Sequence, residues 1–289
     1  FSDNKKRIIN EYSLFATDKF KIFNREIVLG LRSTKYSSYH WQFIPSVSVR
    51  YEDSNGKNIR FNYSKGYRVP SIKELYYNFP DHPVQPLYGN LELRPSTSDY
   101  YALSIEPVES SSSSLEFYVN NVSDMISPVS TSNNRMEYTN VDQIRLYGFN
   151  VNFDIPIHRK FTIKSVLSCT QGKSNDQKLL EGISKYSVNM RIKYNIFKNM
   201  NLLFTTKYNS NKKVFVYGSD GSPGNFYELD SYSISDILLS IKYGKISIKG
   251  GVKNMFDYLA PSRDKEQASE NLTTIDPGQR FYLTINFSI

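Results

Sequence analysis

The residues most suited to binding a ligand gather around one segment of the chain. His82 lies in Asp81-His82-Pro83, within a proline-rich stretch, and Tyr76, Tyr77 and Tyr88 flank it. A neutral imidazole can coordinate a metal, and flat phenol rings can stack on an aromatic ligand. An ordinary loop histidine beside prolines is the competing interpretation. This segment is the first candidate for a ligand site.

No residue pattern indicates an enzyme. The sequence has no Gly-x-Ser-x-Gly, no His-Glu-x-x-His and no glycine-rich phosphate loop. His158 lies in a short turn and His40 lies beside aromatic residues, so we expect no Ser–His pair on adjacent strands. Asp264, Glu266 and Glu270 share a loop, but their spacing is not that of an EF-hand. We therefore expect no catalytic residues and no bound metal.

Composition narrows the class of protein. The 289 residues have a mean hydropathy of −0.49, and no apolar run reaches the length of a transmembrane helix. The net charge is +8, but Lys and Arg are scattered, which favours solvated and lumen-facing charges over nucleic-acid binding. The single cysteine, Cys169, excludes an internal disulfide. Because the chain starts at Phe1 without a signal peptide, we expect a mature form or a fragment.

The last ten residues alternate strictly between apolar and polar. The apolar positions are Phe281, Leu283, Ile285, Phe287 and Ile289. Successive side chains of a strand point to opposite faces. A strand with one apolar and one polar face suits the wall of an outer-membrane barrel, with lipid on one side and a wet lumen on the other.

Similar strand patterns run along the rest of the chain, and about fourteen strands are expected in all. The expected strands run over 11–22, 27–36, 43–51, 59–67, 100–106, 115–122, 144–155, 161–171, 184–194, 201–216, 232–243, 245–253 and the final segment. Short turns alternate with long polar loops, as in outer-membrane barrels and unlike a soluble sandwich. Aromatic residues recur near the strand ends, which favours interfacial girdles over ordinary strand enrichment. The stretch from Pro70 to Pro95 cannot be one regular strand.

Two motifs around this proline-rich stretch resemble those of a known family. Tyr67-Arg68-Val69-Pro70 resembles the Phe-Arg-Ala-Pro box of TonB-dependent outer-membrane receptors. Tyr88-Gly89-Asn90-Leu91-Glu92-Leu93 resembles their Asn-Pro-Asn-Leu box, with Leu91 in place of the proline. Gly89, Asn90 and Leu93 carry that second resemblance.

Three further motifs follow in the family's order. Tyr147-Gly148-Phe149-Asn150 resembles the Gly-x-Glu strand motif, with Asn150 in place of the acid. Asn254-Met255-Phe256-Asp257 is similar to Asn-Leu-Phe-Asp, and Gly278 and Arg280 lie in a sequence similar to the Pro-Gly-Arg entry to the last strand. The order and spacing of all five motifs carry the resemblance.

The resemblance implies an all-β fold, an antiparallel transmembrane β-barrel. Family members have about 22 strands and a plugged lumen. The fourteen strands expected here match the C-terminal part of such a barrel over residues 1–289, with the plug domain absent and an extracellular ligand loop at about 70–96. A self-closing smaller barrel is the alternative.

The resemblance also implies a function. A receptor in the outer membrane of a Gram-negative bacterium would bind and import a scarce nutrient, such as haem or another metal complex. Its partners would be outer-membrane lipid, the TonB complex through the missing plug, and a surface lipoprotein, but no nucleic acid. Haem would be cargo and not a resident cofactor, with His82 as its axial ligand. A corrinoid (vitamin B12) or siderophore receptor, and a passive porin-like or structural barrel, are the alternatives.

Overall fold

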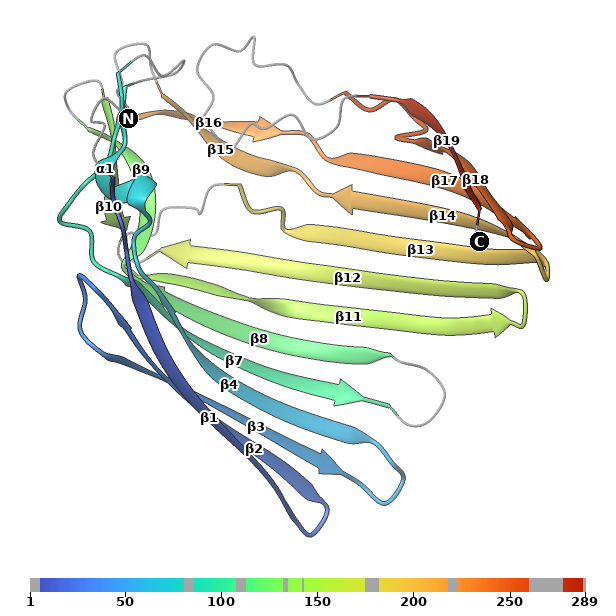
Figure 1. Ribbon diagram of the computed structural model, residues 1–289, viewed down its shortest axis with the longest axis horizontal. Helices are drawn as coiled ribbons and strands as arrows, with labels where there is room; N and C mark the ends of the chain where they lie inside the picture. The colour runs from blue at the N-terminus through green and yellow to red at the C-terminus, as the bar shows by residue number, and fades with distance from the viewer. Residues whose placement is uncertain are drawn as a thin grey trace.

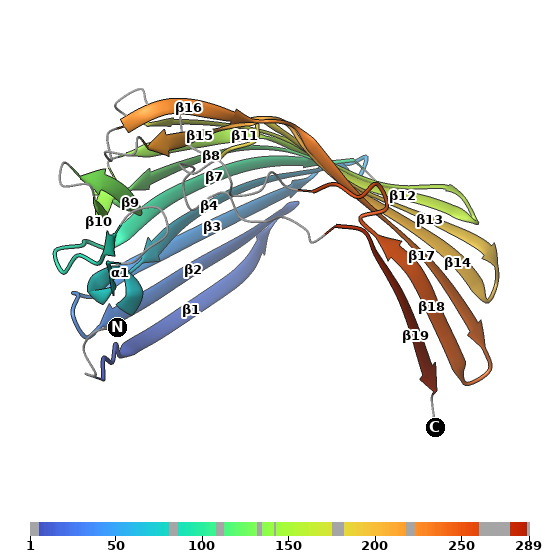
Figure 2. The same cartoon turned by 90° about the horizontal axis from the view of Figure 1, so that it is seen from above.

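The computed structural model describes residues 6–80, 86–107, 113–131, 135–141, 143–174, 182–217, 223–259 and 278–287. Within these residues the chain consists of antiparallel strands and one short helix (Figure 1). One long sheet dominates, and it curves along its length (Figure 2). No helix in the described part of the chain is long and apolar enough to cross a membrane.

The main sheet has thirteen strands in the described residues. Each strand pairs with the main-sheet strands that come directly before and after it along the chain. In spatial order they are β1 (Glu11–Ile22), β2 (Arg25–Tyr36), β3 (Gln42–Glu52), β4 (Asn58–Arg68), β7 (Ser96–Glu106), β8 (Ser114–Ser123), β11 (Ile144–His158), β12 (Phe161–Ser174), β13 (Tyr186–Phe197), β14 (Met200–Asn209), β17 (Tyr232–Tyr243), β18 (Ile246–Lys253) and β19 (Arg280–Phe287). The strand labels missing from this order belong to strands of the smaller sheets, which lie in the connections between main-sheet strands. β1 and β19 are the two ends of this order, so the described sheet does not close into a ring.

Two smaller sheets and the helix lie in the long connections. The four-stranded sheet contains β5 (Asn78–Phe79), β6 (Leu87–Tyr88), β10 (Arg135–Val141) and β9 (Met125–Thr131), in that order. The two-stranded sheet is the hairpin of β15 (Lys212–Tyr217) and β16 (Pro223–Leu229). The helix, α1 (Ile72–Tyr76), directly precedes β5.

The strand register gives the main sheet an apolar outer face. Direct cross-strand pairing aligns a row of residues on five neighbouring strands: Phe61, Leu103, Phe117, Phe149 and Cys169. Phe117 and Phe149 lie with ring centroids 6.3 Å apart. Large apolar side chains on this face are exposed, as suits a surface that lipid covers.

The opposite, inner face of the sheet is polar and internally paired. Arg60 forms an ion pair with Glu106 at 3.5 Å. Tyr118 crosses over β11 and shares a 2.7 Å hydrogen bond with Thr170 of β12. It can do so because Gly148 lies beneath it; a Cβ there would collide with the carbonyl oxygen of Cys169 and approach the Tyr118 hydroxyl. Gly148 of the strand motif is therefore required by packing.

All the long connections of the main sheet lie at one end. β4–β7, β8–β11, β12–β13, β14–β17 and β18–β19 are joined there, and α1 and the small sheets lie at this end in Figure 1. Connections at the other end are short, such as the turn at residues 244–245 between β17 and β18. The predicted alternation of short turns and long loops is confirmed, and we call the two ends the loop end and the turn end.

The structure also corrects the sequence reading. The expected strand 201–216 is two strands, because the chain leaves the main sheet at Ser210. That side chain is buried and its Oγ accepts a hydrogen bond from the Tyr186 backbone N–H at 3.0 Å. Helix α1 and strands β9 and β10 were not predicted. The thirteen main-sheet strands agree with the expected number of about fourteen.

Candidate functional site

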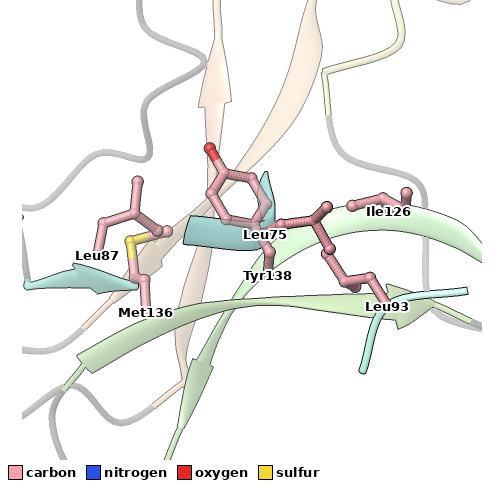
Figure 3. Packing of buried hydrophobic residues seen from close by; sticks show 6 residues of the cluster. All are labelled: Leu75, Leu87, Leu93, Ile126, Met136 and Tyr138. Atoms are coloured by element: carbon pink, nitrogen blue, oxygen red, sulfur yellow. The ribbon is translucent and has the colours of Figure 1, made fainter. Parts of the chain in front are cut away.

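A small apolar core holds the loop end together. Its buried members come from α1, β6, β9, β10 and the segment after β6, and Figure 3 shows them converging: Leu75, Leu87, Leu93, Ile126, Met136 and Tyr138. Parallel pairing of β6 with β10, with Met136 opposite Leu87, joins two loops that lie about fifty residues apart in sequence. The predicted ligand loop is thus one half of a two-loop unit, which we call the apical core.

The first family motif builds helix α1. Ser71 caps the helix: its Oγ accepts from the Glu74 N–H, and the Glu74 carboxylate accepts from the Ser71 N–H at 2.8 Å. Arg68 donates to both carboxylate oxygens of Glu74 at 3.0 Å. Pro70 is fully buried beside this arrangement. Arg68 and Pro70 therefore position the helix.

The second motif closes the loop onto that helix. The Gly89 N–H donates to the Tyr77 carbonyl at 2.7 Å, and the Asn90 N–H donates to the Glu74 carbonyl at 2.9 Å. A Cβ on Gly89 would lie 2.6 Å from the carbonyl carbon of Leu75, so only glycine fits. Asn90 Oδ1 accepts from the Glu92 N–H, and the chain then turns Leu93 into the apical core.

Polar contacts join the segment after β6 to the β2–β3 connection and to β10 of the small sheet. The Tyr39 hydroxyl donates to the Leu93 carbonyl at 3.2 Å, and burial, followed by the proximity of Tyr76, raises the pKa of Tyr39. Tyr39 therefore stays a protonated donor at neutral pH. The Asn140 amide donates to the Arg94 carbonyl and accepts from the Arg94 N–H, both at 2.8 Å. Tyr67 packs 6.3 Å from Tyr36 between ring centroids.

Each of the three predicted ligand tyrosines has a cation over its ring. Arg7 lies 4.2 Å from the centroid of Tyr76. Lys73 lies 4.7 Å from Tyr77, and Arg135 lies 5.5 Å from Tyr88. All three tyrosines are partly exposed, and all three cations are exposed. The arrangement presents flat rings and positive charge together at the loop end, which suits an anionic aromatic ligand.

These cations were missed from the sequence. Lys73 could have been found, because it lies four residues before Tyr77 on the predicted loop. Arg7 precedes β1, and Arg135 lies 47 residues beyond Tyr88, so only the fold brings them to the tyrosines.

The histidines contribute nothing to this arrangement within the described residues. His82 lies outside them. His40 and His158 are exposed, and His158 Nδ1 accepts from the Lys160 N–H at 3.3 Å within its turn. The predicted carboxylates Asp264, Glu266 and Glu270 also lie outside the described residues. In the described part of the chain, no group of three or more His, Cys, Asp or Glu side chains could hold a metal ion.

The fourth motif, Asn254-Met255-Phe256-Asp257, builds the corner between β18 and the last loop. Asn254 is fully buried with a positive φ of 49°. Its side chain donates to the Tyr258 carbonyl at 2.8 Å and accepts from the Tyr258 N–H at 2.9 Å. Its own N–H donates to Asp236 of β17 at 2.8 Å. Asn254 therefore holds the segment that follows β18 in place against β17.

The last motif joins the start of β19 to that corner. Gly278 adopts a φ of 95°, which favours glycine. The Gln279 N–H donates to Asp257 at 2.7 Å, and the Gln279 side chain donates to the Met255 carbonyl. Phe256 is two-thirds exposed, and Arg280 opens β19 opposite Lys253. These residues shape the corner, far from the three tyrosines in sequence.

Comparison with known proteins decides the family. A family model described as "TonB dependent receptor-like, beta-barrel" matches residues 2–255. The chain belongs to this TonB-dependent receptor β-barrel family. The family is one of outer-membrane transporters and receptors of Gram-negative bacteria, not of enzymes, and the resemblance, fold class and localisation predicted from the sequence are confirmed.

Individual relatives are similar across most of this chain. The ferric enterobactin receptor PirA of Pseudomonas aeruginosa is 20% identical over 284 residues, which cover 90% of this chain and 38% of that protein. The structure of the P. aeruginosa ferric enterobactin receptor PfeA has a TM-score of 0.79 at 18% identity, covering 97% of this chain and 45% of that one. The siderophore receptor PirA of Acinetobacter baumannii has the same TM-score and identity, covering 97% and 46%. The chain thus spans less than half the length of these relatives.

Proposed function

We propose that this chain is the C-terminal part, over residues 1–289, of an outer-membrane receptor that binds a ferric siderophore at its loop end. The ligand would be an anionic, aromatic iron chelate held on the extracellular loop at about 70–96 and its neighbours. Import would be driven by the TonB complex. The names of the related ferric enterobactin and siderophore receptors point in the same direction.

One observation carries the proposal: Tyr76, Tyr77 and Tyr88 each lie within 5.5 Å of a cation at the loop end. Phenol rings stack on a flat aromatic chelate, and exposed guanidinium and ammonium groups attract its negative charge. Because the apical core holds the three tyrosines, Lys73 and Arg135 on two loops, this surface is preorganised, which lowers the entropic cost of binding.

Haem ligation by His82, a corrinoid ligand and a passive pore remain predictions of the sequence alone. The haem hypothesis needs an imidazole on the iron and a Soret shift that depends on it. The passive pore needs neither a high-affinity ligand nor TonB. One set of measurements separates them.

The experiment is calorimetric titration of the complete receptor in detergent with ferric enterobactin as the probe. Arg135→Gln should weaken binding about fivefold, because it removes one exposed positive charge beside Tyr88, and such a charge contributes about 1 kcal/mol to holding an anionic ligand. Arg159→Gln, an equal charge change in an exposed turn at the turn end, should leave affinity unchanged. An equal loss of affinity in both variants would show that only the net charge of the protein matters, and it would contradict a local binding site.

The same protein is then titrated with haem, with and without His82→Ala. A His82-dependent Soret shift, with no binding of the siderophore, would replace the siderophore proposal with the haem hypothesis. Uptake of iron-labelled siderophore by cells should vanish when TonB is deleted. Uptake that survives the deletion would favour the passive pore.

A further inference from the structure

Two cations lie directly opposite one another on the outer face of the sheet. Arg145 of β11 pairs with Lys173 of β12 in the strand register. The same row continues through Asn121, Asp99 and Lys65 on the preceding strands. Both Arg145 and Lys173 are exposed. This pair lies near the loop end, outside the arrangement of tyrosines described above.

The pair borders the apolar surface. From Arg145 toward the turn end, the next residues on the same face of β11 are Tyr147 and Phe149, and Phe149 is 39% exposed. From Lys173 toward the turn end, the next residues on that face of β12 are Gln171 and Cys169. The Tyr147 hydroxyl donates to Gln171 Oε1 at 2.9 Å, forming a polar rim directly above the apolar row. Tyrosines and long cationic side chains at such a boundary are typical of the level of lipid headgroups.

The arginine is held in place while its charge is left uncompensated. Arg145 Nε donates to Asn121 Oδ1 at 2.8 Å, which leaves the two terminal nitrogens of the guanidinium available. No carboxylate among the described residues forms an ion pair with Arg145 or Lys173. The acid in the row, Asp99, instead accepts a hydrogen bond from Tyr63 at 2.8 Å. Like charges directly opposite each other on paired strands destabilise a sheet. An anion bound between Arg145 and Lys173 would relieve this repulsion.

We propose that Arg145 and Lys173 form a binding site for the phosphate headgroup of a lipid in the membrane leaflet at the loop end. A guanidinium binds two phosphate oxygens with parallel hydrogen bonds, and the ammonium adds a point charge. The acyl chains of the lipid extend from there toward the turn end and cross the apolar row that includes Phe149 and Cys169. Attachment to that surface distinguishes a lipid from a free phosphate ion.

The test titrates the complete receptor in detergent with phosphatidic acid, with phosphatidylcholine and inorganic phosphate as comparison ligands. Phosphatidic acid should bind more tightly than phosphatidylcholine, and inorganic phosphate should not displace it. Arg145→Gln combined with Lys173→Gln should weaken phosphatidic acid binding about thirtyfold, as expected for two cations near a headgroup. Arg191→Gln combined with Lys207→Gln makes the same charge change on the inner face and should leave binding unchanged.

Equal binding by the Arg145/Lys173 double variant and the parent protein would overturn the proposal. Displacement by inorganic phosphate would also overturn it, because the site would then hold a free anion. If the double variant does not fold, the parent protein decides alone. Its phosphatidic acid affinity must fall as salt rises, and an affinity independent of salt contradicts an ionic site.

Discussion

At the scale of single residues, the family motifs are structural. Asn254 shows this most clearly, since it is fully buried, has a positive φ, and hydrogen-bonds both backbone groups of Tyr258. Asparagine tolerates the left-handed region better than most residues and supplies both a donor and an acceptor. Asparagine meets both demands, which accounts for its place in the motif.

Asn254→Ala should lower the free energy of unfolding by about 3 kcal/mol. It leaves two buried backbone groups unpaired and places a Cβ-bearing residue without a compensating hydrogen bond at positive φ. Asn254→Gly removes the same hydrogen bonds but relieves the backbone, so its loss should be smaller. Urea unfolding of the receptor in detergent measures both, with Asn199→Ala in an exposed turn as the control. Equal losses for Ala and Gly would show that the positive φ costs nothing.

The sequence predicted some of the candidate site and could not predict the rest. Tyr76, Tyr77 and Tyr88 are described and meet cations, whereas the role of His82 stays a prediction. Arg7 and Arg135 could not be found from the sequence, because their positions depend on which loops the sheet brings together.

At the scale of elements, helix α1 is too short to be stable alone. Five residues make little more than one turn, and isolated helices of this length are unstable in water. Its stability comes from the Ser71–Glu74 capping box, the Arg68 contact and the burial of Leu75. Glu74 takes part in the first two, so it is the residue whose loss should release the helix.

Glu74→Ala should speed hydrogen exchange of the Leu75 and Tyr77 amides roughly tenfold, because losing a cap costs about 1–2 kcal/mol locally. Glu74→Gln keeps a carbonyl acceptor for the Ser71 N–H and should have a smaller effect. Exchange followed by mass spectrometry gives both numbers. Glu92→Ala, an exposed acid in the same loop, is the control; an equal effect there would mean that charge and not capping stabilises the helix.

Strands were far easier to predict from the sequence than this helix. Alternation of apolar and polar residues reveals a strand wherever one face meets lipid, so the thirteen main-sheet strands could be expected. The apical core lacks that alternation. Its short strands β5 and β6 have two residues each, and pairing between distant loops decides where they form.

At the scale of the whole molecule, the outer face should tolerate charge poorly. Val151 lies on the outer face of β11 between Leu115 and Leu167, and Asn152 lies on the inner face, where it donates to Ser114 Oγ. Val151→Arg should cost about 2–4 kcal/mol in a bilayer, the usual range for a cation near the midplane of an outer-membrane barrel.

Asn152→Arg is the matched variant and should cost much less, because it faces the polar interior. Urea unfolding from phosphatidylcholine vesicles compares the two. If both substitutions are equally tolerated, lipid does not cover the outer face.

The apical core also has a consequence for how such receptors diversify. Leu75 and Leu87 belong to the same buried cluster as Ile126, Met136 and Tyr138, so the β4–β7 and β8–β11 connections share one interior. A recombination event or an engineered chimera that replaces one loop alone would expose half of that interior. New ligand preferences should therefore spread through the family by exchange of the two loops as a pair.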